Sequence, residues 1–168
     1  MEKINNLNMN KVYLTIDFED WSHDFKRLLN IDVSASIREN AIYQSYEIIN
    51  NFCKNLKQNS KITFFCTGIL AQKYPDIIRQ ISKDGHEIAC HYYFHDLVYQ
   101  DQPNIFEKNL YKAKEFLQQS SGQEVYGFRA PIFSIKKENI EHYKILSKIF
   151  KYDSSFICNS INQLNSFK

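Results

Sequence analysis

The segment KITFFCTGILAQKYPDIIRQISKDGHEIACH, residues 61–91, contains a strand, a helix and a second strand in succession. Residues 61–66 are rich in β-branched and aromatic side chains and predict a buried strand. Residues 75–83 predict a helix that stops at Gly85, because glycine adopts positive φ at little cost. Residues 86–91 predict the next strand. This order indicates a parallel β-α-β unit.

The alternation of strands and helices continues on both sides of this segment. Further strands are predicted at residues 11–18, 125–128 and 152–155, and further helices at residues 36–58, 103–119 and 137–150. Ser36 and Glu39 have the spacing of a capping box, and Pro103 suits a first helical turn. The sequence therefore predicts an α/β fold, either a (β/α) barrel or a doubly wound sheet.

Length and composition indicate one globular domain. The chain has 168 residues, of which 43% are hydrophobic and 24% charged. A net charge of +2, with lysines scattered singly, argues against a nucleic-acid partner. No apolar run approaches the roughly 18 residues of a membrane span, and residues 1–10 lack a secretory signal. We expect a cytoplasmic protein without a transmembrane segment, whose four separated cysteines are buried free thiols.

Polar residues follow three of the predicted strands. In both candidate architectures, ligand chemistry lies at the carboxyl ends of the strands. The first strand ends in an acidic cluster, the third in a histidine and the fourth in an arginine; these residues are Asp17, Glu19, Asp20, His91 and Arg129. The sequence therefore predicts that they gather at one edge of the sheet.

His91 and His95 are four residues apart, a spacing that lets two imidazoles bind one ion. Two histidines and one carboxylate are a common ligand set for zinc and other first-row metals. The simpler alternatives are exposed or capping histidines, a solvated acidic loop, and a surface salt bridge for Arg129. In its functional role, Arg129 would hold the catalytic acid ionised and orient it.

Five segments, in this order, resemble the polysaccharide deacetylase superfamily, also called NodB-homology or carbohydrate esterase family 4. They are LTIDFEDW at 14–21, TFFCTGILAQKYPDIIRQISKDGHEIACH at 63–91, the H-x-x-x-H pair, GFRAPIFSI at 127–135 and YDSS at 152–155. The chain is most similar to the branch found in exopolysaccharide loci. The resemblance implies a distorted (β/α) barrel and a metal-dependent hydrolase that removes acetyl groups from N-acetylated sugars of a polysaccharide or glycan precursor.

The resemblance also implies roles for individual residues. Asp17 would be the general base, and Arg129 would tether it. Asp20, with Glu19 as the alternative, would complete the metal site with His91 and His95. The metal would be Zn²⁺ first, with Co²⁺, Ni²⁺ or Fe²⁺ as alternatives. The expected substrate groove contains Trp21, Tyr93, Pro131 and Phe133.

The chain departs from the family pattern near its C-terminal end. The histidine that usually protonates the leaving amine is missing, since no histidine follows Asp153. We expect His142 to face solvent, whereas His23 could approach the site. The aromatic run at residues 92–94, where the family often has a small or hydroxyl residue, could form a sugar-stacking surface.

Five predicted strands fall short of a closed barrel. We expect an incomplete catalytic domain at residues 11–157, between a polar segment at 1–10 and a polar tail at 158–168. Its open sheet edge normally has to be covered, so we expect a homo-oligomer, a missing partner segment or poor solubility. Two alternatives to the deacetylase stay open. One is a truncated or inactive fragment that binds metal or glycan, and the other is an amidohydrolase for a small non-sugar amide.

Overall fold

The computed structural model describes residues 13–56 and 60–157 of the chain. Its centre is a five-stranded parallel sheet in the order β1-β2-β3-β4-β5. The strands are β1 (Thr15–Phe18), β2 (Thr63–Cys66), β3 (Glu87–Cys90), β4 (Gly127–Phe128) and β5 (Tyr152–Asp153). This arrangement confirms the predicted α/β class and fits part of a (β/α) barrel, because each strand lies beside the next one in sequence.

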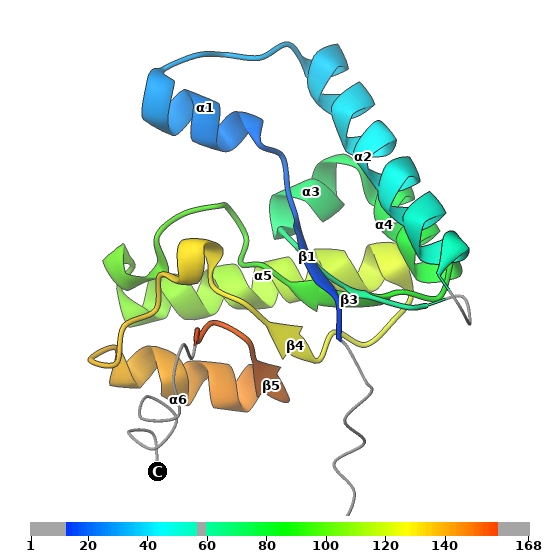
Figure 1. Cartoon of the computed structure of the whole chain (residues 1–168). Coiled ribbons are helices and arrows are strands. Elements are labelled where there is room, and N and C mark those ends of the chain that lie inside the picture. The colour runs from blue at the N-terminus through cyan, green and yellow to red at the C-terminus, as the bar shows by residue number, and fades with distance from the viewer. Residues whose placement is uncertain (1–12, 57–59, 158–168) are drawn as a thin grey trace, which may run out of the picture.

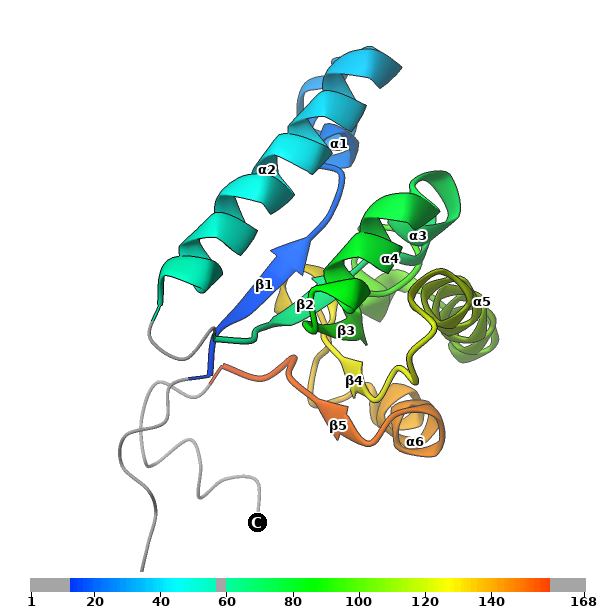
Figure 2. The same cartoon turned by 90° about the vertical axis from the view of Figure 1, so that its right-hand side faces the viewer.

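The helices connect successive strands and form an arc along one face of the sheet (Figure 2). They are α1 (Ser22–Leu29), α2 (Ala35–Asn55), α3 (Gly68–Lys73), α4 (Pro75–Lys83), α5 (Pro103–Ser121) and α6 (Ile140–Ile149), with the short 3-10 turns η1 (Val98–Gln100) and η2 (Pro131–Phe133). In Figure 1, α1 stands above the carboxyl end of β1. None of the described helices is long and apolar enough to cross a membrane.

Several boundaries differ from the sequence-based expectations. The helices α1 and α3 were not predicted, and the strands are shorter than expected. The capping box is wrong: the N-cap of α2 is Ser34, with no side-chain hydrogen bond to the helix. Gly85 does have positive φ, 84°, at the end of α4. The segments at 1–10 and 158–168 lie outside the described residues.

The core lies between the sheet and the helices. Phe64, Ile88 and Phe128 point to this side from three neighbouring strands and are fully buried. Three of the cysteines, Cys53, Cys66 and Cys90, are buried free thiols as expected, whereas Cys158 lies outside the described residues. Burial raises the pKa of the Cys90 thiol to about 12 and also that of Cys66. Neither thiol is therefore a reactive nucleophile near neutral pH.

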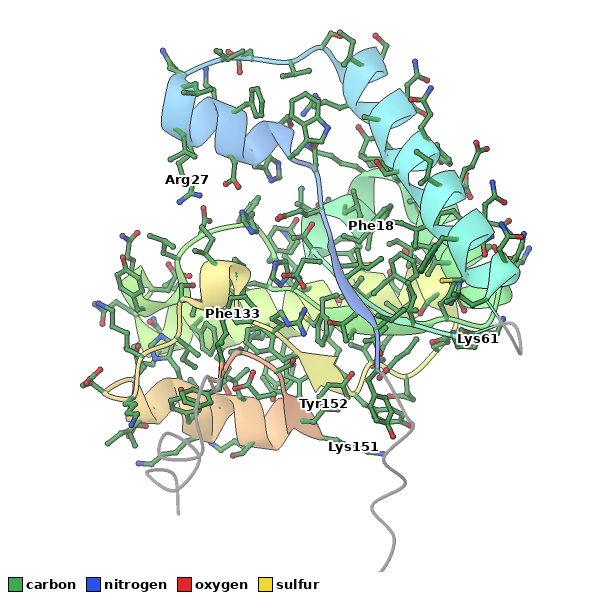
Figure 3. All side chains as sticks on the ribbon, in the orientation of Figure 1. Phe18, Arg27, Lys61, Phe133, Lys151 and Tyr152 are labelled. Carbon is green, nitrogen blue, oxygen red and sulfur yellow. The ribbon has the colours of Figure 1, made fainter. Side chains whose placement is uncertain are left out.

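The opposite face of the sheet carries polar side chains around the Phe65 ring. The guanidinium of Arg129 lies 4.1 Å from the centre of the Phe65 ring. Glu87 accepts hydrogen bonds from Thr63 at 2.6 Å and from Tyr152 at 2.8 Å. In Figure 3, Tyr152 lies on the strand β5 next to β4. These contacts cross from strand to strand, so they stabilise the sheet from its inner side.

Candidate active site

The carboxyl ends of β1 and β3 bring three potential metal ligands together. Glu19 follows β1, and His91 and His95 follow β3. One ligand atom from each of these residues lies within 4.8 Å of the other two. Both histidines are buried, and the Glu19 side chain is 24% exposed. The donor set of two imidazoles and one carboxylate fits a divalent first-row metal ion.

His91 is held in the form that a metal ligand needs. Its Nδ1 lies 2.9 Å from the backbone carbonyl oxygen of Arg129. Because a carbonyl only accepts hydrogen bonds, Nδ1 carries the proton and Nε2 keeps its lone pair. Nε2 lies 3.9 Å from Oδ2 of Asp17. Burial lowers the pKa of His91, in spite of the nearby carboxylates, and so favours the neutral imidazole.

His95 lies between two carboxylates. Its Nε2 is 2.8 Å from Oε2 of Glu19, and its Nδ1 is 3.1 Å from Oδ1 of Asp24. Burial by itself would lower the pKa of His95, but the hydrogen bonds and charges of Glu19 and Asp24 outweigh burial and raise it. The sequence did not identify Asp24, because no spacing pattern connects this residue of the unpredicted helix α1 with the histidine pair.

Asp20 does not lie with Glu19, His91 and His95, although we expected it to be the first choice for the carboxylate ligand. Its side chain is 2% exposed, lies 3.5 Å from Arg38 and accepts a hydrogen bond of 3.0 Å from the backbone N–H of Ser22. Neighbouring residues in extended backbone point to opposite sides, whereas residues two apart share a side. Glu19 therefore faces the same region as Asp17, and Asp20 points away. The geometry favours Glu19, the alternative carboxylate.

Arg129 and Asp17 make the contact that the sequence suggested. Nη1 of Arg129 donates a hydrogen bond of 2.7 Å to Oδ1 of Asp17. Nη2 donates to Thr15 at 3.0 Å and to the Ser154 hydroxyl at 2.8 Å. The Arg129 side chain is 11% exposed, so its position is fixed by these partners and by the Phe65 ring beneath it. Oδ2 of Asp17 stays on the side of the histidines.

The expected groove residues are only partly available to a ligand. Tyr93 is 2% exposed and its hydroxyl donates to Gln72, so its assignment to the groove is wrong. Tyr92 is also buried, which leaves Phe94, 41% exposed, as the accessible ring of residues 92–94. A buried aromatic ring packs against protein and offers no face to a sugar.

Of the remaining expected groove residues, two are accessible to a ligand and one is buried. Trp21 is 36% exposed and Phe133 is 37% exposed, whereas Pro131, the first residue of the turn η2, is buried. Ile132 and Phe133 both have positive φ, 53° and 51°. This left-handed pair is unusual for bulky residues and marks a strained turn. Phe133 lies 5.6 Å from the Arg129 guanidinium and is labelled in Figure 3.

A hollow of about 390 Å³ lies beside His95, between α1 and the loop after β3; its lining is His23, Lys26, Arg27, Phe94, His95 and Asp96. His23 thus approaches the site.

His142 does not face solvent, which corrects our expectation. It is buried, its Nε2 lies 3.1 Å from the backbone oxygen of Asp101, and its ring lies 4.4 Å from that of Phe106.

Comparison with known proteins identifies the family of the chain. The sequence model of the family described as polysaccharide deacetylase matches residues 42–147. A peptidoglycan-N-acetylglucosamine deacetylase of Bacillus cereus is 31% identical over 87 residues, which are 51% of this chain and 32% of that protein. The chain therefore spans about a third of the length of this relative.

Two crystal structures have a similar fold. A putative polysaccharide deacetylase from Mycobacterium smegmatis superposes with a TM-score of 0.65 at 24% identity, over 86% of this chain and 50% of that one. A carbohydrate esterase family 4 pseudoenzyme from Bacillus anthracis superposes with a TM-score of 0.59 at 21% identity, over 66% of this chain and 38% of that one. At this level of identity, the two structures support the fold alone.

Proposed function

The chain belongs to the polysaccharide deacetylase family, and from this premise we propose that it forms the metal-binding and base-carrying part of an enzyme that removes acetyl groups from N-acetylated sugars. One observation carries the proposal. Glu19, His91 and His95 converge within 4.8 Å beside Asp17, which Arg129 holds in place. A structural role alone would not require two buried histidines to share a carboxylate at the strand ends.

The ligands in this proposal are Glu19 and Nε2 of His91 and His95. The metal is Zn²⁺ first, with Co²⁺, Ni²⁺ and Fe²⁺ as alternatives that suit the same donors. When bound, such an ion polarises a carbonyl oxygen and lowers the pKa of water from about 15.7 towards 7. The protein contributes the fixed tautomer of His91 and the opposing carboxylates around His95.

Asp17 acts as the general base in this proposal. Its carboxylate is 31% exposed, so water and substrate reach it, and its Oδ2 accepts a proton from the attacking water. Arg129 fixes Oδ1 and so directs Oδ2 towards the histidines. Trp21, Phe133 and Phe94 offer accessible rings on which a sugar can stack, and the buried Pro131 anchors the first position of η2.

The departing amine needs a proton, and the family's late histidine has no counterpart in this sequence. The absence of this proton donor from residues 1–168 motivates a second candidate function. In that case, the chain binds a metal and a glycan without turnover. A small non-sugar amide is a third substrate class for the same residues. That the chain is most similar to the exopolysaccharide-locus branch of the family stays part of this proposal.

Acetate release is the test of the proposed function. The chain is supplied in turn with Zn²⁺, Co²⁺, Ni²⁺ and Fe²⁺ and incubated with N-acetylglucosamine oligomers, peptidoglycan fragments and small acetamides. Asp17→Asn should lower acetate release by about 10²–10⁴-fold, the usual contribution of a general base. Asp32→Asn is the control, because Asp32 is an exposed acid that pairs with Lys26.

The possible results separate the candidates. Release from sugars alone supports the deacetylase, and release from small acetamides alone supports the amidohydrolase. Metal binding without release by this chain favours the binding function. If longer forms of the protein also release no acetate with any of these metals, the deacetylase proposal is wrong.

A further inference from the structure

Asp24 contacts His95, a proposed metal ligand, but is not itself one of the proposed ligands. Its Oδ1 lies 3.1 Å from Nδ1 of His95, on the opposite side of the imidazole from Glu19. We propose that Asp24 is a positioning residue, which holds His95 with Nε2 directed at the metal site and thereby couples the placement of α1 to metal binding. This inference rests on the proposed metal site.

The hydrogen-bond chemistry requires a specific form of His95. A carboxylate oxygen accepts and does not donate, so the contact with Asp24 places a proton on Nδ1. By the same rule Nε2 donates to Glu19 while no metal is bound, and because Nδ1 is taken by Asp24, Nε2 is the nitrogen that can give up its proton and bind a metal. His91 obtains the same result from a backbone carbonyl, which no side-chain substitution removes. For His95 the position of the ring proton depends on one side chain, that of Asp24, so it can be tested by mutation.

Arg27 places the Asp24 carboxylate. Its Nη2 donates a hydrogen bond of 2.7 Å to the same Oδ1, one helical turn further along α1. Figure 3 shows Arg27 on the side of α1 that faces the rest of the chain. Both Arg27 and Asp24 are about one-third exposed, so this pair alone contributes little to folding stability. Its effect on His95 is therefore separable from an effect on the fold.

The helix α1 has few other attachments to the body of the protein. Among its residues, Ser22 is buried, whereas Phe25, Leu28 and Leu29 are exposed. A helix with so little buried apolar surface gains little from packing. The Asp24–His95 contact therefore matters for where α1 lies, and a metal that fixes His95 should in turn fix α1.

The experiment measures Zn²⁺ affinity by competition with a chromogenic chelator, using four forms of the chain. Asp24→Ala removes the acceptor and should weaken Zn²⁺ binding by about 10–100-fold, the usual cost of losing such a partner. Asp24→Asn keeps an oxygen acceptor and should recover most of that loss. Asp32→Asn is the matched control, since it removes an equally negative, exposed side chain just after α1 without touching His95.

A second readout does not depend on metal. Nitrogen NMR of the metal-free chain should show a proton on Nδ1 of His95 in the parent and in Asp24→Asn. In Asp24→Ala, Nδ1 has lost its acceptor, so the proton should lie on Nε2, which faces the Glu19 carboxylate. Far-ultraviolet circular dichroism checks that each variant is folded, and a variant that loses the fold is replaced by Arg27→Gln, which should weaken Zn²⁺ binding by less than Asp24→Ala.

The outcomes distinguish this inference from the proposed function. A parent chain that is folded but binds none of Zn²⁺, Co²⁺, Ni²⁺ and Fe²⁺ would overturn both. A parent that binds Zn²⁺, together with an Asp24→Ala variant that binds it as tightly as Asp32→Asn, would overturn the role of Asp24 alone. A loss in Asp24→Ala that Asp24→Asn restores, with the change in the His95 proton, would support it.

Discussion

Arg129, at the end of β4, donates a hydrogen bond of 2.7 Å to Asp17, on the edge strand β1. Three strand spacings of about 4.8 Å each, or about 14 Å, would separate β1 from β4 in a flat sheet. One side chain closes this distance over the Phe65 ring of β2, so the sheet must curve towards its polar face. The proposed base and its tether therefore depend on the curvature of a partial barrel.

The first prediction concerns this pair. Arg129→Met should lower the free energy of unfolding by about 1–3 kcal/mol, because it leaves Asp17, Thr15 and Ser154 without their shared donor. Asp17→Asn should cost less than about 1 kcal/mol, since an amide oxygen still accepts. Urea unfolding of both single variants and the double variant measures the coupling. Strictly additive costs would contradict a direct interaction.

The second prediction separates the two carboxylates that follow β1. Glu19→Gln should weaken Zn²⁺ binding by at least about tenfold while the chain stays folded, because it removes a charged ligand. Asp20→Asn should lower stability by about 1–3 kcal/mol, because it disturbs a buried carboxylate paired with Arg38. Its Zn²⁺ affinity should change little. Chelator competition and thermal unfolding measure the two effects. If Asp20→Asn weakens Zn²⁺ binding and Glu19→Gln does not, Asp20 is the ligand.

The sequence predicted the parts of this site that follow from strand ends and fixed spacing. Parallel strands deliver their terminal residues to one edge, so Asp17, His91 and Arg129 were found without coordinates. The choice between Glu19 and Asp20 depends on which side of the chain each residue faces just beyond the strand. That direction depends on tertiary packing, here the contact of Asp20 with Arg38.

The unpredicted elements have a common physical reason. The helix α1 has only eight residues, which is too short a window for the helical spacing of Phe25, Leu28 and Leu29 to stand out in the sequence. Asp24 was missed along with it. Tyr93 and His142 were assigned to accessible positions because polar aromatic side chains often lie there. Both rings are in fact buried, and each polar atom has a hydrogen-bond partner, Gln72 for Tyr93 and the backbone oxygen of Asp101 for His142.

The third prediction tests the close packing of α3 on α5. A Cβ atom at Gly68 would lie 2.7 Å from the Ala113 Cα and 2.7 Å from the Tyr93 ring. Gly68→Ala should therefore lower the urea midpoint, at a cost of about 1–3 kcal/mol for overpacking. Gly122→Ala is the control, since φ is 69° there but no atom lies within 4 Å of the new Cβ. It should cost only about 1 kcal/mol.

The fourth prediction concerns pH and His86. Burial lowers the pKa of His86, with a further lowering by Lys61 and an opposing effect of Asp84. Its Nδ1 accepts the backbone N–H of Ile62, so the neutral ring is the form that the fold uses. Because the folded pKa lies below the unfolded value of about 6.5, the unfolded state binds more protons as pH falls. The His86 contribution is thus complete above pH 6.5 and is lost below it.

Urea unfolding between about pH 7.5 and 5 measures this effect against the unfolded pKa of about 6.5. The parent should lose stability towards low pH faster than His86→Gln does, by at most about 1.4 kcal/mol per pH unit. The difference between the two chains removes the contributions of the other histidines, which include the opposite one of His95. If the free energy of unfolding changes with pH in the same way for both chains, the pKa of His86 is the same in the folded and unfolded states, and the prediction is wrong.

The fifth prediction concerns the open side of β1. Within residues 13–56 and 60–157, β1 pairs with β2 alone, so its outer edge offers free backbone groups to another strand. Beside that edge lies an apolar groove of about 330 Å³; its lining is Leu14, Thr15, Ile16, Ile48, Ile49, Phe52, Cys53 and Ile62. Ile48 is 71% exposed and Phe52 is 56% exposed. An apolar groove next to the free edge of a strand favours association with another copy of the chain.

We therefore expect the purified chain to form dimers or larger species in sedimentation velocity runs, with the fraction increasing with concentration. Ile48→Lys should shift the equilibrium towards monomer, because it places a charge in the groove and leaves the core intact. Ile105→Lys changes an equally apolar residue, 44% exposed on α5, and should leave the equilibrium unchanged. Since the two substitutions add the same charge, a general gain in solubility would affect both. A parent chain that sediments as a monomer at every concentration would show that β1 is not an association edge.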